Sequence, residues 1–556
     1  MVRIIWIILF TYFAVVASRA VDATEALVYD IAIIGGRVMD PETKFDAVRN
    51  VGILDGRIAA ITSDPIGAQE VIDAVGMVVA PGFIDTQFHG QDVFASKMAL
   101  RDGVTTGLDL EGGAINVGSW YKKKEGRWQI NFGVAASYPF ARMAVHDTEV
   151  SFQVAVDFGS GGSHIAKAAA DGLSGWSESR SNTHQINQIS ALIDEDLRQG
   201  AIGVGIPLAY MARAASSYEV FEVQRTAARY GRPASVHTRF HLDSKPPTES
   251  AIGFDEVFTN AALLGAPLLI AHNNDYGWEE IEEKLQLARL RGMNMWSEYY
   301  PYDAGSTAVS AAFLQPAVWE EKYGYKYEDT LYDPKTDRLL DKRSYQSLVE
   351  EDPSRTVVVF LPPRRQWLPY WLTMPHMTVA SDGMPGVGGN GKLLPWNAEY
   401  TDYVGHPRSA GTRAKVLRMG REYGVPLMHT LAQLSYWSAK HLGDAGLLSM
   451  KDRGRMQVNK VADIVVFDPD KVTDHAGFKA GTTGLPSTGI PWVIVNGMVV
   501  VNNSRVLSHV TPGTAIRYPV EEQGRFTSLS AEQWVREFTI LPGRFDEKVD
   551  FSHLPD

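Results

Sequence analysis

Hydrophobic residues near both ends of the chain follow the pattern of short β-strands. Apolar runs over residues 30–40 and 51–61 are broken by Gly and Asp-Gly turns, and the same texture returns over 462–468 and 492–501. Because the two groups are so alike, we expect them to form one small β-sandwich domain built from both ends of the chain.

The middle of the chain has a different pattern, in which short apolar runs alternate with amphipathic stretches. The spacing of apolar residues predicts helices over 189–197 and 279–291 and strands over 201–205, 233–237 and 268–272. Such alternation is typical of βα units around a parallel barrel. The fold class is therefore α/β, and the expected architecture is a (β/α)₈ barrel with active-site residues where its strands end.

One part of this middle region departs from the alternation. From about residue 314 to 374 the sequence is aromatic, charged and irregular, which favours a lid or an oligomer contact rather than a separate domain. The expected organisation is a signal peptide at 1–23, the β-domain halves at 28–80 and 451–520, the barrel at 81–450 with this insertion, and a C-terminal extension at 521–556.

The amino-terminal segment resembles a secretory signal peptide. Arg3 precedes an apolar run that continues to Ala17, and small residues suited to cleavage follow at Ser18, Ala20 and Ala23. We therefore expect export to the periplasm or the medium. The alternative is an uncleaved membrane anchor, although the apolar run is shorter than the ~20 residues that a spanning helix needs.

Composition narrows the class of partner. The chain has 556 residues, of which 45% are hydrophobic, and a formal net charge of −12. This charge and the lack of a long basic run argue against nucleic acid or an anionic membrane surface as a partner. A small molecule is the expected partner, with a homo-oligomer possible. The absence of cysteine excludes disulfides and thiolate metal ligands.

Five residues that can bind metal or transfer protons directly follow apolar runs of the predicted barrel: His89, Glu111, His237, His272 and Asp382. Imidazole and carboxylate groups hold divalent ions such as zinc, and a catalytic site leaves one position for water. The ion lowers the pKa of that water toward ~7, so hydroxide forms at neutral pH. A nearby carboxylate then acts as general base and acid, and Asp382 is the candidate for this role.

The first of these strands carries an unusual pair. In the run of residues 81–90, Gln87 and His89 point the same way because side chains on a strand alternate. Two imidazoles at these positions would chelate one ion, but a neutral amide is a poor zinc ligand. We expect one tightly bound zinc ion and a second ion site that is weak or absent.

Several motifs in this order resemble those of the amidohydrolase superfamily, and within it the N-acyl-D-amino-acid deacylases, often called D-aminoacylases. The resemblance covers residues 30–501. It rests on Pro81-Gly82-Phe83-Ile84-Asp85, Gly103-Val104-Thr105-Thr106, His237-Thr238-Arg239, Glu298-Tyr299-Tyr300-Pro301-Tyr302, Ser381-Asp382-Gly383-Met384-Pro385 and His406-Pro407-Arg408-Ser409-Ala410-Gly411-Thr412. The opening residues also resemble sequences called D-glutamate deacylases.

The resemblance implies a distorted TIM barrel, metal-dependent hydrolysis of the amide bond of an N-acyl-D-amino acid, and specific residue roles. His237 and His272 are the implied ligands of the tightly held ion, and Asp382 is the implied acid and base. Arg408 is implied to bind the α-carboxylate, a role that suits a bidentate guanidinium. The expected substrate-binding residues are Arg408, Tyr210, Arg239 and Tyr300.

Three departures from the family pattern change the expected site. Where the family has a cysteine ligand, Glu111 or a residue one position away is the natural replacement. Gln87 stands where the family has the first histidine of its pair, so His89 remains alone. Asn274 replaces a lysine that helps to hold the substrate carboxylate. Arg239 and Arg408 could still bind an anion, and Lys245 or Arg142 could serve a second carboxylate.

Three hypotheses follow. The leading one is a metal-dependent N-acyl-D-amino-acid deacylase. A second is another amidohydrolase, acting on a cyclic amide or a dipeptide with the same residues. The third is a catalytically silent barrel that is retained for binding, which Gln87 and Asn274 make plausible. Asp382 beside the metal ligands would argue against the silent barrel, and arginines converging on an anion pocket would favour the deacylase.

Overall fold

The computed structural model describes residues 28–170, 174–242 and 248–530, and its centre is a barrel of parallel strands. An isolated bridge between Phe88 and Gly383 joins the first and last strands just beyond their ends. The expected (β/α)₈ barrel is confirmed. In sheet order its strands are β18 (Met377–Val379), β13 (Met295–Tyr299), β12 (Leu268–Ile270), β11 (Ala234–His237), β10 (Val204–Pro207), β8 (Asn131–Ser137), β7 (Val104–Ile115) and β6 (Phe83–Asp85).

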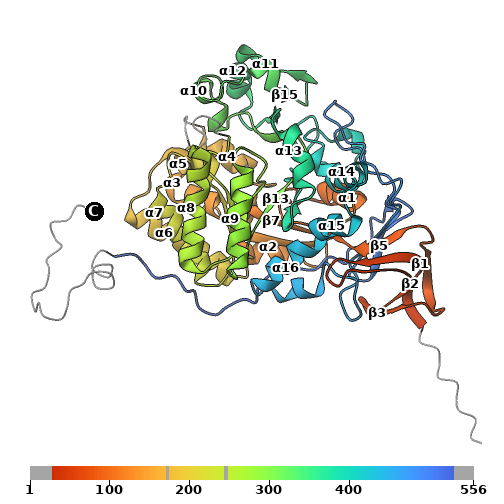
Figure 1. Cartoon of the computed structure of the whole chain (residues 1–556). Coiled ribbons are helices and arrows are strands. Elements are labelled where there is room, and N and C mark those ends of the chain that lie inside the picture. Colours follow the sequence, from red (N-terminus) through yellow and green to blue (C-terminus); the bar gives the residue numbers. More distant parts are fainter. Residues whose placement is uncertain (1–27, 171–173, 243–247, 531–556) are drawn as a thin grey trace, which may run out of the picture.

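Helices surround the barrel, and the two at the front of Figure 1 are α8 and α9. Their apolar faces pack against the outward-facing side chains of the strands, in a cluster that includes Val204, Val236 and Leu268. The principal helices are α1 (Val93–Arg101), α2 (Val117–Lys124), α3 (Tyr138–His146), α6 (Thr183–Arg198), α7 (Ser217–Ala228), α8 (Thr248–Leu264), α9 (Trp278–Leu290), α14 (Arg408–Glu422) and α15 (Leu427–Leu431).

A second cluster fills the inside of the barrel. Ile84, Leu108, Leu269 and Trp296 come from different strands and pack together with Leu442 of helix α16 (Trp437–Asp444). This packing closes the barrel at the end that contacts α16. The polar residues lie at the opposite end, where the strands finish and where barrel enzymes have their active sites. The interior is a solid core rather than a channel.

The expected β-domain built from both ends of the chain is present (Figure 1). Strand β5 from the amino-terminal part pairs antiparallel with β19 from the carboxy-terminal part, which places Val79 opposite Val466. One sheet therefore contains β1 (Val28–Asp40), β2 (Phe45–Leu54), β3 (Arg57–Thr62), β4 (Gly67–Asp73), β5 (Val78–Pro81), β19 (Ile464–Phe467), β20 (Trp492–Val495), β21 (Met498–Asn502) and β22 (Arg505–Val506).

The insertion before the last barrel strand is more regular than its sequence indicates. It begins with a strand at Ala304 rather than at residue 314, and Trp319 and Tyr327 lie in a hydrophobic core of its own. The sequence does not reveal these elements because the strands are short and pair out of sequence order, and a role as a lid or an oligomer contact stays a prediction. They are β14 (Ala304–Ala308), β17 (Thr356–Phe360), β15 (Leu331–Asp333) and β16 (Arg338–Leu339), with helices α10 (Pro316–Trp319), α11 (Tyr327–Thr330), α12 (Lys342–Glu351) and α13 (Arg364–Trp371).

Two expectations concern the ends of the chain. The signal peptide at 1–23 lies outside the described residues, as does most of the C-terminal extension, so both stay predictions. Within the described ranges, every helix is too short or too polar to cross a lipid bilayer.

A pair of histidines connects the start of the last barrel strand to helix α16 at the closed end of the barrel. His376, just before β18, lies with its Nδ1 3.0 Å from Nε2 of His441 on α16, and His441 Nδ1 lies 2.7 Å from the side-chain oxygen of Asn294. The His441 ring stacks on Trp296, with 4.7 Å between centroids. Burial lowers the pKa of His376 to about 4 and holds that of His441 well below its usual range. Both imidazoles are therefore neutral in the folded protein at pH 7.

The neutral pair predicts acid sensitivity. As the pH falls from about 6.5 to about 4, the unfolded chain binds protons that the folded pair does not bind, so the free energy of unfolding decreases by up to about 1.4 kcal/mol per pH unit for each histidine. The substitution His376→Asn keeps a donor near the Nδ1 position and tolerates the positive φ of 66° at this residue. We expect it to reduce the loss of stability between pH 7 and pH 5 by about 1 to 2 kcal/mol, the share of one histidine, as measured by urea unfolding.

A suitable control is His475→Asn, since His475 is exposed and bonds only to Thr488 on the surface. This control should keep the wild-type dependence on pH. An unchanged dependence in His376→Asn would show that other groups control the acid sensitivity.

Candidate metal centre and active site

Glu111 comes from a distorted part of strand β7. The pairing of β7 with β8 shifts register after Asp109, whose side chain accepts hydrogen bonds from the backbone amides of Gly112 and Gly113 at 2.8 and 3.1 Å. Gly113 has a φ of 71°, and a Cβ there would lie 2.7 Å from a backbone carbonyl oxygen of β8, so only glycine fits. The distortion leaves the Glu111 side chain buried and facing the neighbouring strands.

The two expected histidine ligands meet this carboxylate. His237 ends β11, and its Nδ1 lies 3.0 Å from Oε1 of Glu111. His272 follows β12, and its Nε2 lies 3.6 Å from Oε2 of Glu111. All three side chains are buried. The structure therefore brings the three residues together as the carboxyl ends of parallel strands require.

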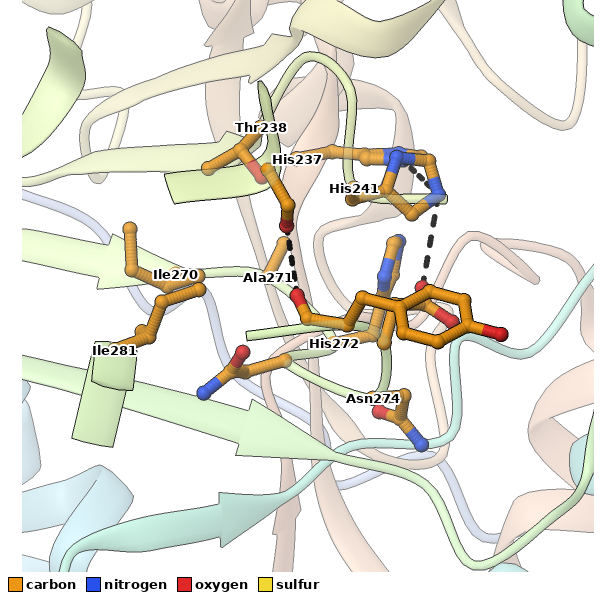
Figure 2. A pocket seen from close by; sticks show the side chains of 12 residues that line it. His237, Thr238, His241, Ile270, Ala271, His272, Asn274 and Ile281 are labelled. Carbon is orange, nitrogen blue, oxygen red and sulfur yellow. Dashed lines mark hydrogen bonds and ion pairs between the residues drawn. The ribbon is translucent and has the colours of Figure 1, made fainter. Parts of the chain in front are cut away.

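A further histidine, His241, supports His237. The Nε2 atom of His237 lies 3.1 Å from a ring nitrogen of His241, and His241 in turn lies 3.7 Å from Oδ2 of Asp275. Figure 2 shows the rings of His237, His241 and His272 gathered on one side of a small pocket. A ligating histidine commonly uses its second nitrogen for such a contact. This arrangement leaves Nδ1 of His237 directed at Glu111.

The backbone is strained at two of these positions. His272 has a φ of 28° and Asp382 a φ of 50°, in the left-handed region that non-glycine residues rarely occupy. Surrounding contacts hold this geometry: Asp85 of β6 accepts a hydrogen bond from the amide of Ser381 at 3.0 Å and pairs with Arg413 at 2.9 Å. The first barrel strand thus fixes the loop that carries Asp382.

Asp382 lies between two positively charged groups. Its Oδ1 is 3.2 Å from Nε2 of His89, and its Oδ2 is 2.6 Å from Nη1 of Arg408. Burial would raise the pKa of the Asp382 carboxyl, but the charge of Arg408 and the hydrogen bond from His89 outweigh it and hold the pKa below its usual range. Asp382 is therefore ionised at neutral pH, as a general base must be.

His89 and Gln87 both contact the acidic centre, in different ways. His89 has Nδ1 3.1 Å from Asp109, and although burial lowers its pKa, the carboxylates of Asp109 and Asp382 raise it well above the usual value. Gln87 donates from Nε2 to Oε2 of Glu111 at 2.7 Å. The Gln87 amide is therefore hydrogen-bonded to an oxygen of Glu111, at the position where a histidine side chain could bind a metal.

Two overlapping groups in the described chain could hold an ion. Glu111, His237 and His272 form one, His89, Glu111 and Asp382 form the other, and the donor atoms in each lie within 4.8 Å of one another. The first group offers two imidazoles and one carboxylate, a set that suits zinc and leaves a coordination position for water. The second has a single imidazole, and that ring is already engaged by Asp109. The first group is the better metal site.

The positively charged residues face a small cavity of about 50 Å³ beside the ligands. Arg408 lies over the ring of Tyr300 at 4.8 Å, and Arg364 donates to the Tyr300 hydroxyl at 2.6 Å. Tyr210 packs edge-on against His237 and bonds to Thr307 at 3.2 Å. Arg408, Tyr300 and Tyr210 thus line the cavity as expected, and their roles toward a substrate stay predictions.

Other expected anion-binding residues lie elsewhere. Arg239 was a wrong choice, because its guanidinium pairs with both oxygens of Glu256 at 2.6 and 2.9 Å and bonds to backbone carbonyls. Arg142 is buried and pairs with Glu219. Lys245 lies outside the described residues.

Arg364 is the functional candidate that the sequence did not indicate. It belongs to the insertion and forms a two-pronged ion pair with Asp275 at 2.8 Å, so that one face of the guanidinium reaches the cavity. Asn274, which replaces a family lysine, bonds to the backbone carbonyl of Tyr300 at 2.9 Å. Arg364 therefore brings a guanidinium near a position where Asn274 has no charge, and Asp275 balances the charge of that guanidinium. His241 could have been found from its spacing of four residues after His237.

No protein-family model matches the chain, but individual relatives do. The D-aminoacylase of Alcaligenes xylosoxydans xylosoxydans is 26% identical over 85% of this chain and 94% of its own length. An N-acyl-D-glutamate deacylase from the same organism is also 26% identical, over 85% of this chain and 93% of that protein.

A solved structure gives the same result for the fold. The N-acyl-D-glutamate deacylase from Bordetella bronchiseptica, in complex with zinc and a phosphonate inhibitor that mimics the tetrahedral intermediate, matches with a TM-score of 0.68. The two chains are 21% identical, and the match covers 88% of this chain and 100% of that one. This chain is therefore similar in sequence to a D-aminoacylase and an N-acyl-D-glutamate deacylase and has the fold of the solved structures with these names.

Proposed function

We propose that this protein hydrolyses the amide bond of N-acyl-D-amino acids with the help of one divalent metal ion. The observation that carries the proposal is the position of Asp382. Its carboxylate lies within 4.8 Å of the ligand atom of Glu111 and is paired with Arg408 at 2.6 Å. A base, a metal-binding group and a cation for the substrate carboxylate therefore lie side by side. The D configuration is taken from the two sequence relatives.

The residues present fit a zinc ion. Glu111, His237 and His272 are buried and offer one carboxylate and two imidazoles, and His241 orients His237. The structural relative was solved with zinc, which supports this choice of metal. When bound, the ion supplies a Lewis acid that polarises the amide carbonyl and makes water more acidic. Gln87 supports a single ion because it occupies Oε2 of Glu111.

The remaining residues perform the proton transfers and hold the substrate. Asp382, ionised at neutral pH, accepts a proton from the attacking water and returns it to the leaving amine. The Nε atom of Arg408 is buried without a hydrogen-bond partner in the described chain, so the guanidinium has a donor available for the α-carboxylate. Arg364 lines the same cavity, where its charge is balanced by Asp275 and its third nitrogen donates to Tyr300.

This geometry also distinguishes the alternatives. A silent binding barrel has no need for a carboxylate that is kept ionised beside a metal-binding group. An acyl amino acid always carries a carboxylate, as a dipeptide does, whereas an unsubstituted cyclic amide carries none; Arg408 and Arg364 both face the cavity beside the ligands. These two arginines, rather than the expected Arg408 and Arg239, favour an acyl amino acid.

The role of Asp382 can be tested by Asp382→Asn. Removing the base should lower kcat about 10²- to 10⁴-fold on N-acetyl-D-amino acids. Zinc content should stay the same, because the ligand set of Glu111, His237 and His272 is intact. Initial rates of amino-acid release and metal analysis of the same preparation measure both quantities.

The matched control is Asp303→Asn, since Asp303 pairs with Arg365 outside the cavities. It should keep wild-type activity. Retained turnover in Asp382→Asn would show that the base is misassigned, and a wild-type enzyme that acts on N-acetyl-L-amino acids alone would contradict the proposed stereochemistry.

The number of ions can be tested by Gln87→His. The substitution removes the hydrogen bond that the Gln87 amide donates to Glu111, and it places a second imidazole beside His89. Zinc content should therefore rise from about one toward two ions per chain. Activity should change less than metal content, because the first group already holds the ion that the reaction needs. Metal analysis after dialysis measures the ratio.

Gln91→His is the control for a general effect of an added histidine, because Gln91 is also buried nearby but bonds to backbone carbonyls. It should bind no additional zinc. A ratio near two in the wild-type protein would show that Gln87 does not prevent binding of the second ion.

A further inference from the structure

A second and much larger cavity opens onto the same site. It has a volume of about 480 Å³ and is lined at one end by Glu111, His272 and Asp382. Tyr210 and Thr307 border both this cavity and the small one that holds the arginines, so the two meet beside the metal-binding group. A substrate bound at the ligands can therefore extend in two directions of different character.

One wall of the large cavity comes from the barrel side. Phe140 and Met143 of α3 are buried there, and they belong to a hydrophobic cluster that also includes Ile165 and Trp176. Ile165 lies on α4 (Gly162–Ala168) and Trp176 on α5 (Gly175–Glu178). This wall is apolar and is held in place by its own packing.

The facing wall comes from the insertion. Ala308, Ala311 and Ala312 line it next to Val349 of α12 and Pro353. The three small side chains leave open the space that larger residues would fill, while Ala311 and Val349 pack into the core of the insertion. Both walls thus present carbon atoms to the cavity over most of its length.

Charge determines which part of the substrate enters this cavity. Away from His89, His272 and the carboxylates of the site itself, the charged residues of its described lining are Glu178 and Glu350, with no lysine or arginine. A substrate carboxylate would be repelled by these glutamates, whereas Arg408 in the small cavity has a donor available to bind it. With the carboxylate on that side and the amide bond at the ligands, the acyl group points into the large cavity.

The volume is far more than an acetyl group requires. A water-sized group takes roughly 30 Å³, so the cavity has room for on the order of ten methylene-sized groups. We propose that this enzyme prefers N-acyl amino acids whose acyl group is an alkyl chain of medium length, on the order of eight to ten carbons. This inference rests on the proposed deacylase function and specifies its substrate class.

The test compares two series with the zinc-loaded enzyme. In the first, the acyl chain of one D-amino acid grows from acetyl to decanoyl. Burial of each added methylene should raise kcat/KM roughly fourfold while the chain is enclosed, so octanoyl should exceed acetyl at least about a hundredfold. In the second, the acyl group stays acetyl and the amino-acid side chain grows, and kcat/KM should change by only a few fold.

The substitution Ala312→Trp fills the cavity away from the metal ligands. It should remove most of the preference for octanoyl over acetyl and leave kcat/KM for the acetyl substrate within a few fold of wild type. The matched control is Ala480→Trp, because Ala480 is exposed and lines none of the cavities described above. This control should keep the full preference for the longer chain.

Three results would overturn the inference: equal kcat/KM for acetyl and octanoyl substrates, a gain that follows the side chain instead of the acyl chain, or an unaltered preference in Ala312→Trp. Calorimetry with acetate and decanoate separates this inference from the proposed function. If no acyl amino acid is hydrolysed but decanoate binds more tightly than acetate, and Ala312→Trp abolishes the difference, the proposed function fails and the cavity assignment stands. Equal binding of the two acids contradicts the assignment.

Discussion

The carboxylate of Glu111 is buried where the barrel strands converge, and a buried charge of this kind must be compensated by donors or cations. Gln87 donates a hydrogen bond to one oxygen, His237 contacts the other, and His272 lies within 3.6 Å. Burial would raise the pKa of Glu111, but the charge of His272 and the bond from His237 hold it well below its usual range. A bound cation completes this compensation, so the distortion of β7 that places Glu111 here is the constraint on which the site depends.

Much of this centre could be predicted because parallel strands bring their carboxyl ends together. His237 and His272 follow apolar runs that the sequence makes plain, and Glu111 follows from its place in β7. Arg239 could not be placed in the same way. The chain turns left-handed at Phe240, with a φ of 63°, and Glu256 on α8 captures the guanidinium from 17 residues away. That contact depends on the packing of a helix, which periodicity alone does not specify.

Gln87 is a structural partner rather than a lost ligand. Seen only as a substitution for histidine, it suggests a damaged metal site. In the structure its amide bonds to Oε2 of Glu111, the same oxygen that lies 3.8 Å from His89. The hydrogen bond from Gln87 partly compensates the negative charge of Glu111, so a second ion would gain less by binding there. The same bond restrains the Glu111 carboxylate on the side of the first ion. In the proposed single-ion enzyme, this one substitution would account for both a weaker second site and an intact first one.

The insertion connects the chemistry to substrate choice. Arg364 reaches the small cavity because Asp275, 89 residues earlier in the chain, holds its guanidinium. Ala308 and Ala312 from the same insertion line the large cavity. The barrel thus carries Glu111, His237, His272 and Asp382, while the insertion contributes a guanidinium to the small cavity and apolar lining to the large one, where we propose that the acyl group binds. The core of the insertion also packs against Tyr210, which contacts His237, so the insertion and the metal-binding group share a boundary at this tyrosine.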